Sequence, residues 1–162
     1  MKIPPNAFLL VWVLFNGAAA GQSTFTDFDG RPSDLGKRLY PEAWTVVMLW
    51  HSECHICNEE VGELIRFHGR NQPRAGILGV SLDGYAARGD AQQFIDRHRV
   101  NFPNLIADEA AVAAFYYRHT GERWVGTPTF LIYDPSGELV AKQVGAVSQA
   151  LLEDFIGQQP AR

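Results

Sequence analysis

The chain has few cysteines. Only two occur among its 162 residues, at positions 54 and 57. A disulfide between them would close a very short loop, and closing so short a loop adds little stability. An excess of positive charge is also missing: the formal net charge is −4, which argues against binding to the phosphate backbone of nucleic acids. Heptads, internal repeats and low-complexity tracts are absent as well. These absences point to one ordinary domain whose cysteines need a functional explanation.

The first twenty residues have the pattern of a secretory signal peptide. Lys2 gives a positive start, residues 7–15 (AFLLVWVLF) form an apolar run, and residues 18–20 give an A-x-A cleavage site. The apolar run is shorter than a membrane-spanning helix requires, and an uncleaved anchor is the alternative. We therefore expect a signal peptide at residues 1–20 and a domain at residues 21–162. The mature protein would then work in the periplasm or another extracytoplasmic compartment, where disulfides persist.

Hydrophobic patterning predicts strands that alternate with helices. Continuous apolar runs are typical of strands buried on both faces of a sheet, and apolar residues three or four positions apart indicate helices. The expected strands cover residues 45–50, 75–82, 102–107, 129–133 and 138–144, after a short strand or turn at 25–31. Three helices are expected first: from the cysteines to a cap at Gly69, from a capping box at Asp90 to residue 99, and from a cap at Asp108 to residue 118. A last helix is expected from a cap at Ser148 onward. Its inward-facing residues would be Leu151, Leu152, Phe155 and Ile156. This order predicts an α/β domain with a mixed sheet between helical layers.

The two cysteines lie between a predicted buried strand and the helix that follows it. A thiol at a helix N-terminus meets unpaired backbone N–H groups and the positive end of the helix dipole, and both favour the thiolate. Cys54 is therefore expected to attack a substrate disulfide. Cys57 comes nearly one turn later, where it can attack the mixed disulfide and release the product. A protonated His55 would add to the stabilisation of the thiolate.

A Cys-x-x-Cys pair also occurs in metal sites, which normally provide two further ligands. His51 and His55 are the nearest candidates here. One would end a strand and the other would begin a helix, which strains tetrahedral binding, so we expect no metal. A copper-binding metallochaperone that uses Cys54, Cys57 and these histidines is the alternative from another functional class. A peroxidase of the peroxiredoxin type is disfavoured because its Pro-x-x-x-Thr/Ser-x-x-Cys context is absent, and a pure interaction domain would not need the cysteines at all.

The chain resembles the exported TlpA/ResA-type thiol-disulfide oxidoreductases of thioredoxin-like fold over about residues 25–156. The resemblance rests on Trp50 four residues before Cys54, on the CHIC motif, and on Glu60 three residues after Cys57. It also rests on the segments ILGVSLD (residues 77–83), FPNLIAD (residues 102–108) and GTPTFLIYDPSGEL (residues 126–139).

This resemblance implies a three-layer α/β/α thioredoxin-like fold with a central insertion, and no cofactor apart from the Cys54–Cys57 pair. It implies a cis bond at Thr127-Pro128 that, together with Trp50, borders the substrate, and a proton-relay role for Glu60 near Cys57. The implied partners are protein disulfide or dithiol substrates, with the cysteine pair of apocytochrome c as one class, and a membrane electron donor. The protein is expected to be a monomer.

Three positions depart from the family pattern. Glu53 replaces an aromatic residue before Cys54, and its charge should oppose thiolate formation. Ile56 replaces a proline, which alters the start of the helix, and Val61 replaces a helix-kinking proline, for which Gly62 offers a substitute bend. Glu53 and His55 are therefore expected to tune the pKa of Cys54. The direction of exchange stays open between our prediction, a reductase, and an oxidase or isomerase of the same fold.

Overall fold

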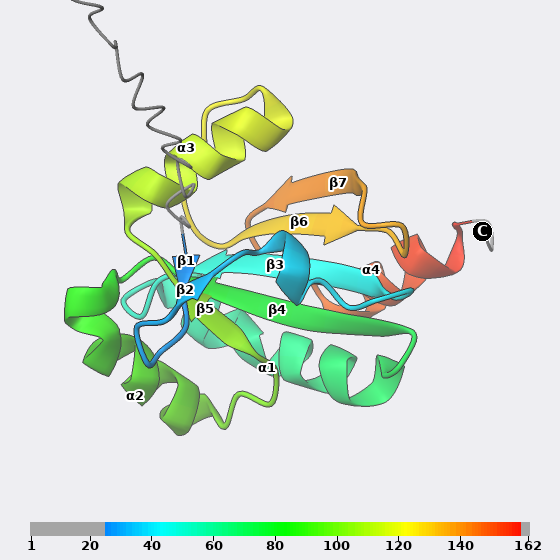
Figure 1. Ribbon diagram of the computed structural model, residues 1–162. Helices are drawn as coiled ribbons and strands as arrows, with labels where there is room; N and C mark the ends of the chain where they lie inside the picture. Colours follow the sequence, from blue (N-terminus) through cyan, green and yellow to red (C-terminus); the bar gives the residue numbers. More distant parts are fainter. Residues whose placement is uncertain (1–24, 160–162) are drawn as a thin grey trace, which may run out of the picture.

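Figure 1 shows the computed structural model, which describes residues 25–159. The predicted signal peptide lies outside the described residues. The strands are β1 (Phe25–Thr26), β2 (Pro32–Ser33), β3 (Trp44–Trp50), β4 (Ala75–Ser81), β5 (Asn104–Ile106), β6 (Thr129–Tyr133) and β7 (Leu139–Val144). The helices are α1 (His55–Asn71), α2 (Arg88–His98), α3 (Glu109–Thr120) and α4 (Gln149–Gly157), with 3₁₀ turns η1 (Gly36–Arg38) and η2 (Tyr85–Ala87). None of the helices in this described part is long and apolar enough to cross a membrane.

The seven strands form one sheet in the order β2-β1-β5-β4-β3-β6-β7. Strands β3, β4 and β5 run parallel to one another, and the remaining neighbours pair antiparallel. Parallel neighbours need a long connection across the sheet, and α1 and α2 supply it on either side of β4 in the chain. The predicted mixed sheet is therefore present, with its parallel strands in the middle.

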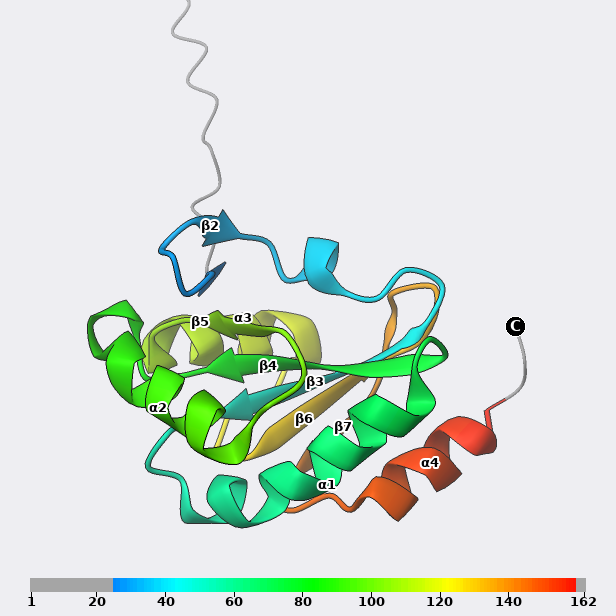
Figure 2. The same cartoon turned by 90° about the horizontal axis from the view of Figure 1, so that it is seen from below.

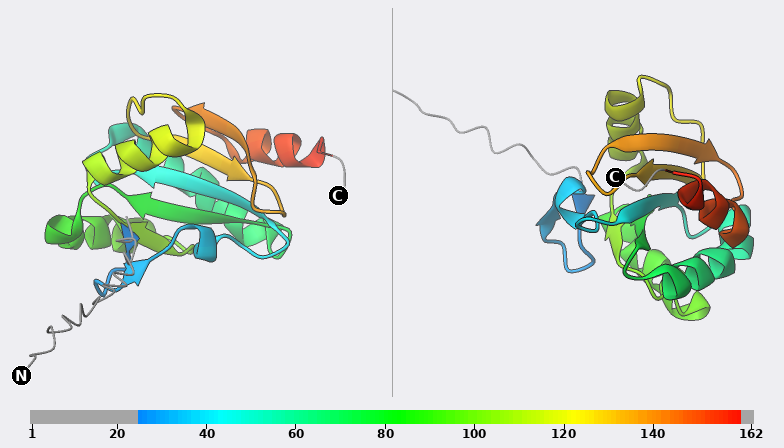
Figure 3. Two further views of the ribbon diagram at one scale, coloured as in Figure 1. Left: turned by 45° about the horizontal axis from the view of Figure 1, so that its top comes forward. Right: turned by 90° about the vertical axis from the view of Figure 1, so that its right-hand side faces the viewer.

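Two hydrophobic clusters cover the two faces of the sheet. Val46 and Met48 face the cluster that contains the apolar sides of α1, α2 and α4, whereas Val47 and Leu49 face the cluster under α3. This alternation follows from the two-residue repeat of a strand. Figures 2 and 3 show α1 and α4 side by side on one face and α3 on the other, which gives the three layers.

The register of the central strands brings three connecting segments to one edge of the sheet. Trp50, the last residue of β3, pairs with Ser81 at the end of β4. Leu49 pairs with Thr129 at the start of β6. The residues that follow β3, follow β4 and precede β6 therefore meet at this edge, which is where ligands bind in sheets with parallel central strands.

The ends of two helices differ from the prediction. Gly69 does not cap α1, which continues to Asn71 and ends at Gln72 in an extended conformation before Pro73; a residue before proline is biased away from helical backbone. The capping box at Asp90 is also wrong. The 3₁₀ turn η2 leads directly into α2 at Arg88, so Asp90 lies inside the first turn.

Two other helix starts agree with the prediction in position. Asp108 is the N-cap residue of α3, although its side chain makes no capping bond. Ser148 caps α4, and its hydroxyl accepts a hydrogen bond from the Leu151 N–H group at 3.2 Å. Leu151 does not face inward, since 54% of it is exposed. The other three predicted residues do face inward: Leu152 and Ile156, four residues apart, are buried, and the half-buried Phe155 packs against the same cluster.

Candidate active site

Cys54 and Cys57 form a disulfide at the start of α1, with an S–S distance of 2.21 Å and Cα atoms 5.2 Å apart. Cys54 is the N-cap residue, and its sulfur accepts a hydrogen bond from the Cys57 N–H group at 3.1 Å. The same donor is in place to stabilise a Cys54 thiolate after reduction. Cys57 is 0% exposed, whereas Cys54 is half-buried, so a partner can reach the pair only at Cys54.

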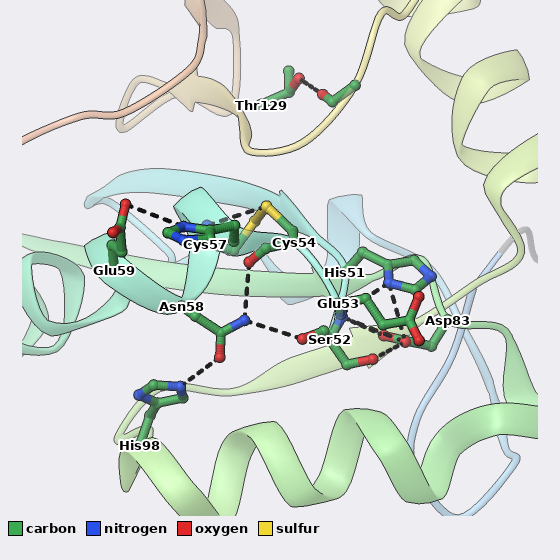
Figure 4. The surroundings of a disulfide bond; sticks show 12 residues. His51, Ser52, Glu53, Cys54, Cys57, Asn58, Glu59, Asp83, His98 and Thr129 are labelled. Carbon is green, nitrogen blue, oxygen red and sulfur yellow. Dashed lines mark hydrogen bonds and ion pairs between the residues drawn. A yellow bond between two sulfur atoms is a disulfide. The ribbon is translucent and has the colours of Figure 1, made fainter.

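The loop that carries Cys54, residues 51–54, is fastened to the end of β4 by a buried carboxylate (Figure 4). The Asp83 side chain is 2% exposed and accepts hydrogen bonds from the N–H group of Ser52 at 3.1 Å and from its hydroxyl. The Ser81 hydroxyl donates to Oδ2 of this carboxylate at 2.6 Å, the oxygen that also accepts from the Ser52 N–H group. A buried charge needs several donors of this kind, and here they also fix the loop.

The two histidines of the WHSECHIC segment turn to carboxylates. His51 Nδ1 lies 3.5 Å from Asp83 Oδ1 and accepts a hydrogen bond from the Glu53 N–H group at 3.2 Å. The His55 side chain is 82% exposed, and its Nδ1 lies 3.3 Å from a carboxylate oxygen of Glu59. Among the described residues, no three or more His, Cys, Asp or Glu side chains are grouped to hold a metal ion. The geometry gives the copper alternative no support.

The segment before β6 lies at the edge of the sheet that also carries the disulfide. The Thr127-Pro128 peptide bond is cis, Pro128 is buried, and Thr127 and Gly126 are half-buried. Figure 4 shows Thr129, at the start of β6, across from the Cys54–Cys57 pair. The Thr129 hydroxyl donates to the Gly126 carbonyl, which folds this segment back on itself, and Thr127 is partly exposed within it.

Trp50 does not border the substrate as expected. It is 1% exposed because its place at the end of β3 turns its side chain toward the helical layer. The indole N–H donates to Asn104 Oδ1 at 3.0 Å, and the ring stacks on Phe94 of α2 with centroids 4.3 Å apart. Trp50 therefore supports the site from below instead of contacting a bound partner.

The two remaining predicted acidic residues lie on opposite sides of the cysteine pair in the chain. Glu53 is exposed in the loop that precedes Cys54. Glu60 is half-buried on α1, one turn after Cys57. The proton-relay role for Glu60 stays a prediction, and its position on the helix of the buried thiol is compatible with that role.

Four polar residues of the site are not marked by any motif in the sequence: Ser52 within the loop, and Asn58, Asp83 and His98 behind it. A signal for Asp83 was present, because an acidic residue directly after a buried parallel strand belongs at the ligand-binding edge of the sheet. The contact between Asn58 and His98 joins residues forty positions apart. Nothing local in the sequence marks that contact.

The fold and the cysteine pair are those of a thioredoxin-like thiol-disulfide oxidoreductase whose redox group is its own Cys54–Cys57 pair. The AhpC/TSA family model matches residues 17–142, and the chain belongs to this family. The predicted fold and enzyme class are thereby confirmed.

Similar proteins carry names of the same class. The chain is 21% identical over 126 residues to "Thiol-disulfide oxidoreductase YkuV" of Bacillus subtilis (strain 168), covering 75% of this chain and 80% of the relative. A secreted Mycobacterium tuberculosis disulfide oxidoreductase is 25% identical, with a TM-score of 0.63 and coverage of 85% and 96%. The thioredoxin domain of a thiol-disulfide oxidoreductase from Bacteroides vulgatus is 20% identical, with a TM-score of 0.66 and coverage of 83% and 90%.

Proposed function

We propose that the protein is an exported disulfide reductase, in which Cys54 attacks a disulfide of a protein substrate and Cys57 resolves the intermediate. The observation that carries this proposal is the unequal exposure of the two sulfurs: Cys54 is half-buried at the N-cap of α1 and Cys57 is fully buried. An attacking thiol must be reachable by its substrate, whereas a resolving thiol needs to reach only its neighbour.

The exchange has two steps with balanced electrons. The Cys54 thiolate attacks one sulfur of the substrate disulfide, so that a Cys54–substrate disulfide forms and the second substrate sulfur leaves as a thiolate. The Cys57 thiolate then attacks Cys54 Sγ, which forms the Cys54–Cys57 disulfide and releases the first substrate sulfur. Two electrons pass from the cysteine pair to the substrate, and the two substrate thiolates take up protons.

Two further parts of the site assist the exchange in this proposal, Glu60 and the surface around Thr127 and Pro128. Glu60, one turn after Cys57, accepts the proton that the Cys57 thiol loses before the second step. The surface around Thr127 and Pro128 holds an extended substrate segment, which pairs with the backbone at Thr127 like an added strand. The place of Thr129, the next residue in the chain, across from the disulfide supports that role.

The compartment and the electron donor belong to the same proposal. The pattern of residues 1–20 supports export, and the similar Mycobacterium tuberculosis protein is described as secreted. In an oxidising compartment a reductase is regenerated by a dithiol that draws electrons from inside the cell, and we propose a membrane protein for that role. The substrates are protein disulfides, among them the cysteine pair of an apocytochrome c.

The test is reduction of insulin by residues 21–162, compared with the Cys54→Ser and Cys57→Ser variants. Cys54→Ser abolishes turnover, whereas Cys57→Ser accumulates a mixed disulfide that mass spectrometry detects. The direction is tested by the reduction potential of the pair in glutathione buffers. A value near that of a strong oxidant, about −120 mV, would contradict the reductase proposal.

A further inference from the structure

The side chain of Asn58 ties the loop at residues 51–54 to two helices (Figure 4). Asn58 directly follows Cys57 in the first turn of α1. Its amide nitrogen Nδ2 donates to the Ser52 carbonyl at 3.1 Å and to the Cys54 carbonyl at 2.9 Å. Its amide oxygen Oδ1 lies 2.9 Å from His98 Nε2, at the end of α2. The Asn58 amide thus hydrogen-bonds the loop on both sides of Glu53, and His98 of α2 hydrogen-bonds the amide in turn.

His98 determines which way the Asn58 amide points. The amide nitrogen faces two carbonyls, so the amide oxygen must face a donor, and the His98 Nε2–H group is that donor. Burial and the neighbouring charge of Arg97 lower the pKa of His98, which favours the neutral ring. The neutral ring that donates to Asn58 carries its proton on Nε2, and the protonated ring carries a proton there as well. The donor is therefore present in both protonation states of His98.

Aromatic packing holds His98 in place. Its ring lies on Phe94 with centroids 4.7 Å apart, and Phe94 stacks on the buried Trp50. A chain of contacts therefore links the end of β3, through Phe94 and His98 of α2, to Asn58 in the first turn of α1. Rigid backing of this kind is what a reactive group needs in order to keep its geometry during a reaction.

We propose that Asn58, oriented by His98, is a positioning residue that keeps Cys54 above the N-terminus of α1 after the disulfide has been reduced. The loop then stays close to Cys57, and the effective concentration of Cys57 toward Cys54 is high. This raises the stability of the Cys54–Cys57 disulfide and speeds its formation in the resolving step. The inference rests on the exchange chemistry of the proposed function, but not on the direction of the exchange.

The test measures the glutathione equilibrium and the two exchange steps in Asn58→Ala. Without the amide, the loop separates from Cys57 in the dithiol state. We expect the equilibrium constant for the disulfide to fall about tenfold, which corresponds to about 30 mV for a two-electron couple. The resolving step slows by a similar factor, whereas the first attack by Cys54 changes less than about threefold. A general loss of structure would slow both steps together.

His98 gives a second, independent variant. His98→Phe keeps a ring against Phe94 and removes the donor to Asn58, and we expect about a threefold fall in the same equilibrium constant. His98→Gln, which restores an amide donor, returns the constant toward the wild-type value. In the Asn58→Ala background, His98→Phe has no further effect, because the group it orients is already gone.

Asn71→Ala is the matched control, since the Asn71 amide donates to the Phe67 carbonyl at 2.9 Å at the other end of α1. It lowers the stability of the fold and leaves the glutathione equilibrium unchanged. The proposal is overturned if Asn58→Ala behaves like this control, or if the effects of Asn58→Ala and His98→Phe add in full. Should Asn58→Ala not fold, His98→Phe and His98→Gln decide the question. An oxidising wild-type potential would contradict the reductase proposal but leave these differences between variants intact.

Discussion

The two ends of α1 are held by similar hydrogen bonds, yet only one of them carries reactive groups. At the amino end, Asp83 and Asn58 bind the backbone of the loop before Cys54. At the carboxyl end, Asn71 donates to Glu153 of α4 at 3.0 Å, and His68 Nδ1 accepts from the Ile77 N–H group of β4 at 3.0 Å. The amino-end bonds orient sulfur atoms, whereas the carboxyl-end bonds join elements that are already packed. Changes at the first end should alter exchange, and changes at the second should alter stability alone.

The largest effect is expected for Asp83→Asn. The amide keeps one acceptor oxygen and replaces the other with an N–H donor, so at least one of the Ser52 and Ser81 groups that donate to the wild-type carboxylate loses its acceptor. Losses of this kind cost about 1–3 kcal/mol for each group. We expect the free energy of unfolding to fall by about 3 kcal/mol and insulin reduction to slow by about tenfold or more. Denaturant titration and the turbidity assay measure the two quantities.

Asp96→Asn is the control for this variant, because Asp96 is exposed on α2. It should leave both measurements close to wild type. If Asp83→Asn lost stability but kept full activity in the folded fraction, the amino end of α1 would be no different from the carboxyl end.

An effect of intermediate size on the stability of the fold is expected when the pH is lowered. Burial lowers the pKa of His68, and burial together with Arg97 lowers that of His98. A histidine with a lowered pKa binds fewer protons in the folded than in the unfolded state, so its contribution to stability is complete above the unfolded pKa of 6.5 and is lost as the pH falls below that value. Unfolding titrations between neutral and mildly acidic pH should therefore show stability declining toward acid.

Substitution of either histidine should make this decline shallower. His68→Gln should do so with no change in the glutathione equilibrium, whereas His98→Phe should change both. Equal slopes in wild type and both variants would show that neither histidine is the source of the acid sensitivity.

The smallest effect is expected for Glu53→Gln. Glu53 is exposed, and an exposed charge acts through water, where interactions at contact distance amount to about 1 kcal/mol or less. Removing the negative charge favours the thiolate, so the pKa of Cys54 should fall slightly. The ultraviolet absorbance of the thiolate reports this shift, and Asp154→Asn, which removes an exposed charge on α4, serves as a control. A rise in the pKa would show that Glu53 acts through a hydrogen bond and not through its charge.

Local patterns in the sequence were sufficient for most elements. Strand β6 has the predicted bounds, and Ser148 caps α4 as expected, because an apolar run and a capping serine act on their own neighbours. The partners of Trp50 could not be read locally, since Phe94 and Asn104 come from distant segments. The pairing of β1 with β2 and β5 involves so few residues that no period is visible in the sequence.

The residues of the candidate site also fall into those that local sequence patterns identify and those that they do not. Cys54 and Cys57 were evident from their spacing and from the helix that follows them. Asp83 and Asn58 were not, because their importance comes from bonds to backbone groups of a loop and not from a side-chain motif. Sequence patterns identify the groups that react more readily than the groups that hold them.

The complete burial of Cys57 has a consequence for kinetics. Electrons can enter and leave the pair only through Cys54 Sγ, so the electron donor and the substrate must use the same small surface in turn. Turnover should then follow a ping-pong scheme, with parallel lines in double-reciprocal plots and with each partner acting as a competitive inhibitor of the other at high concentration. The two partners would also share the chemical features that fit this surface, although they belong to opposite halves of the cycle.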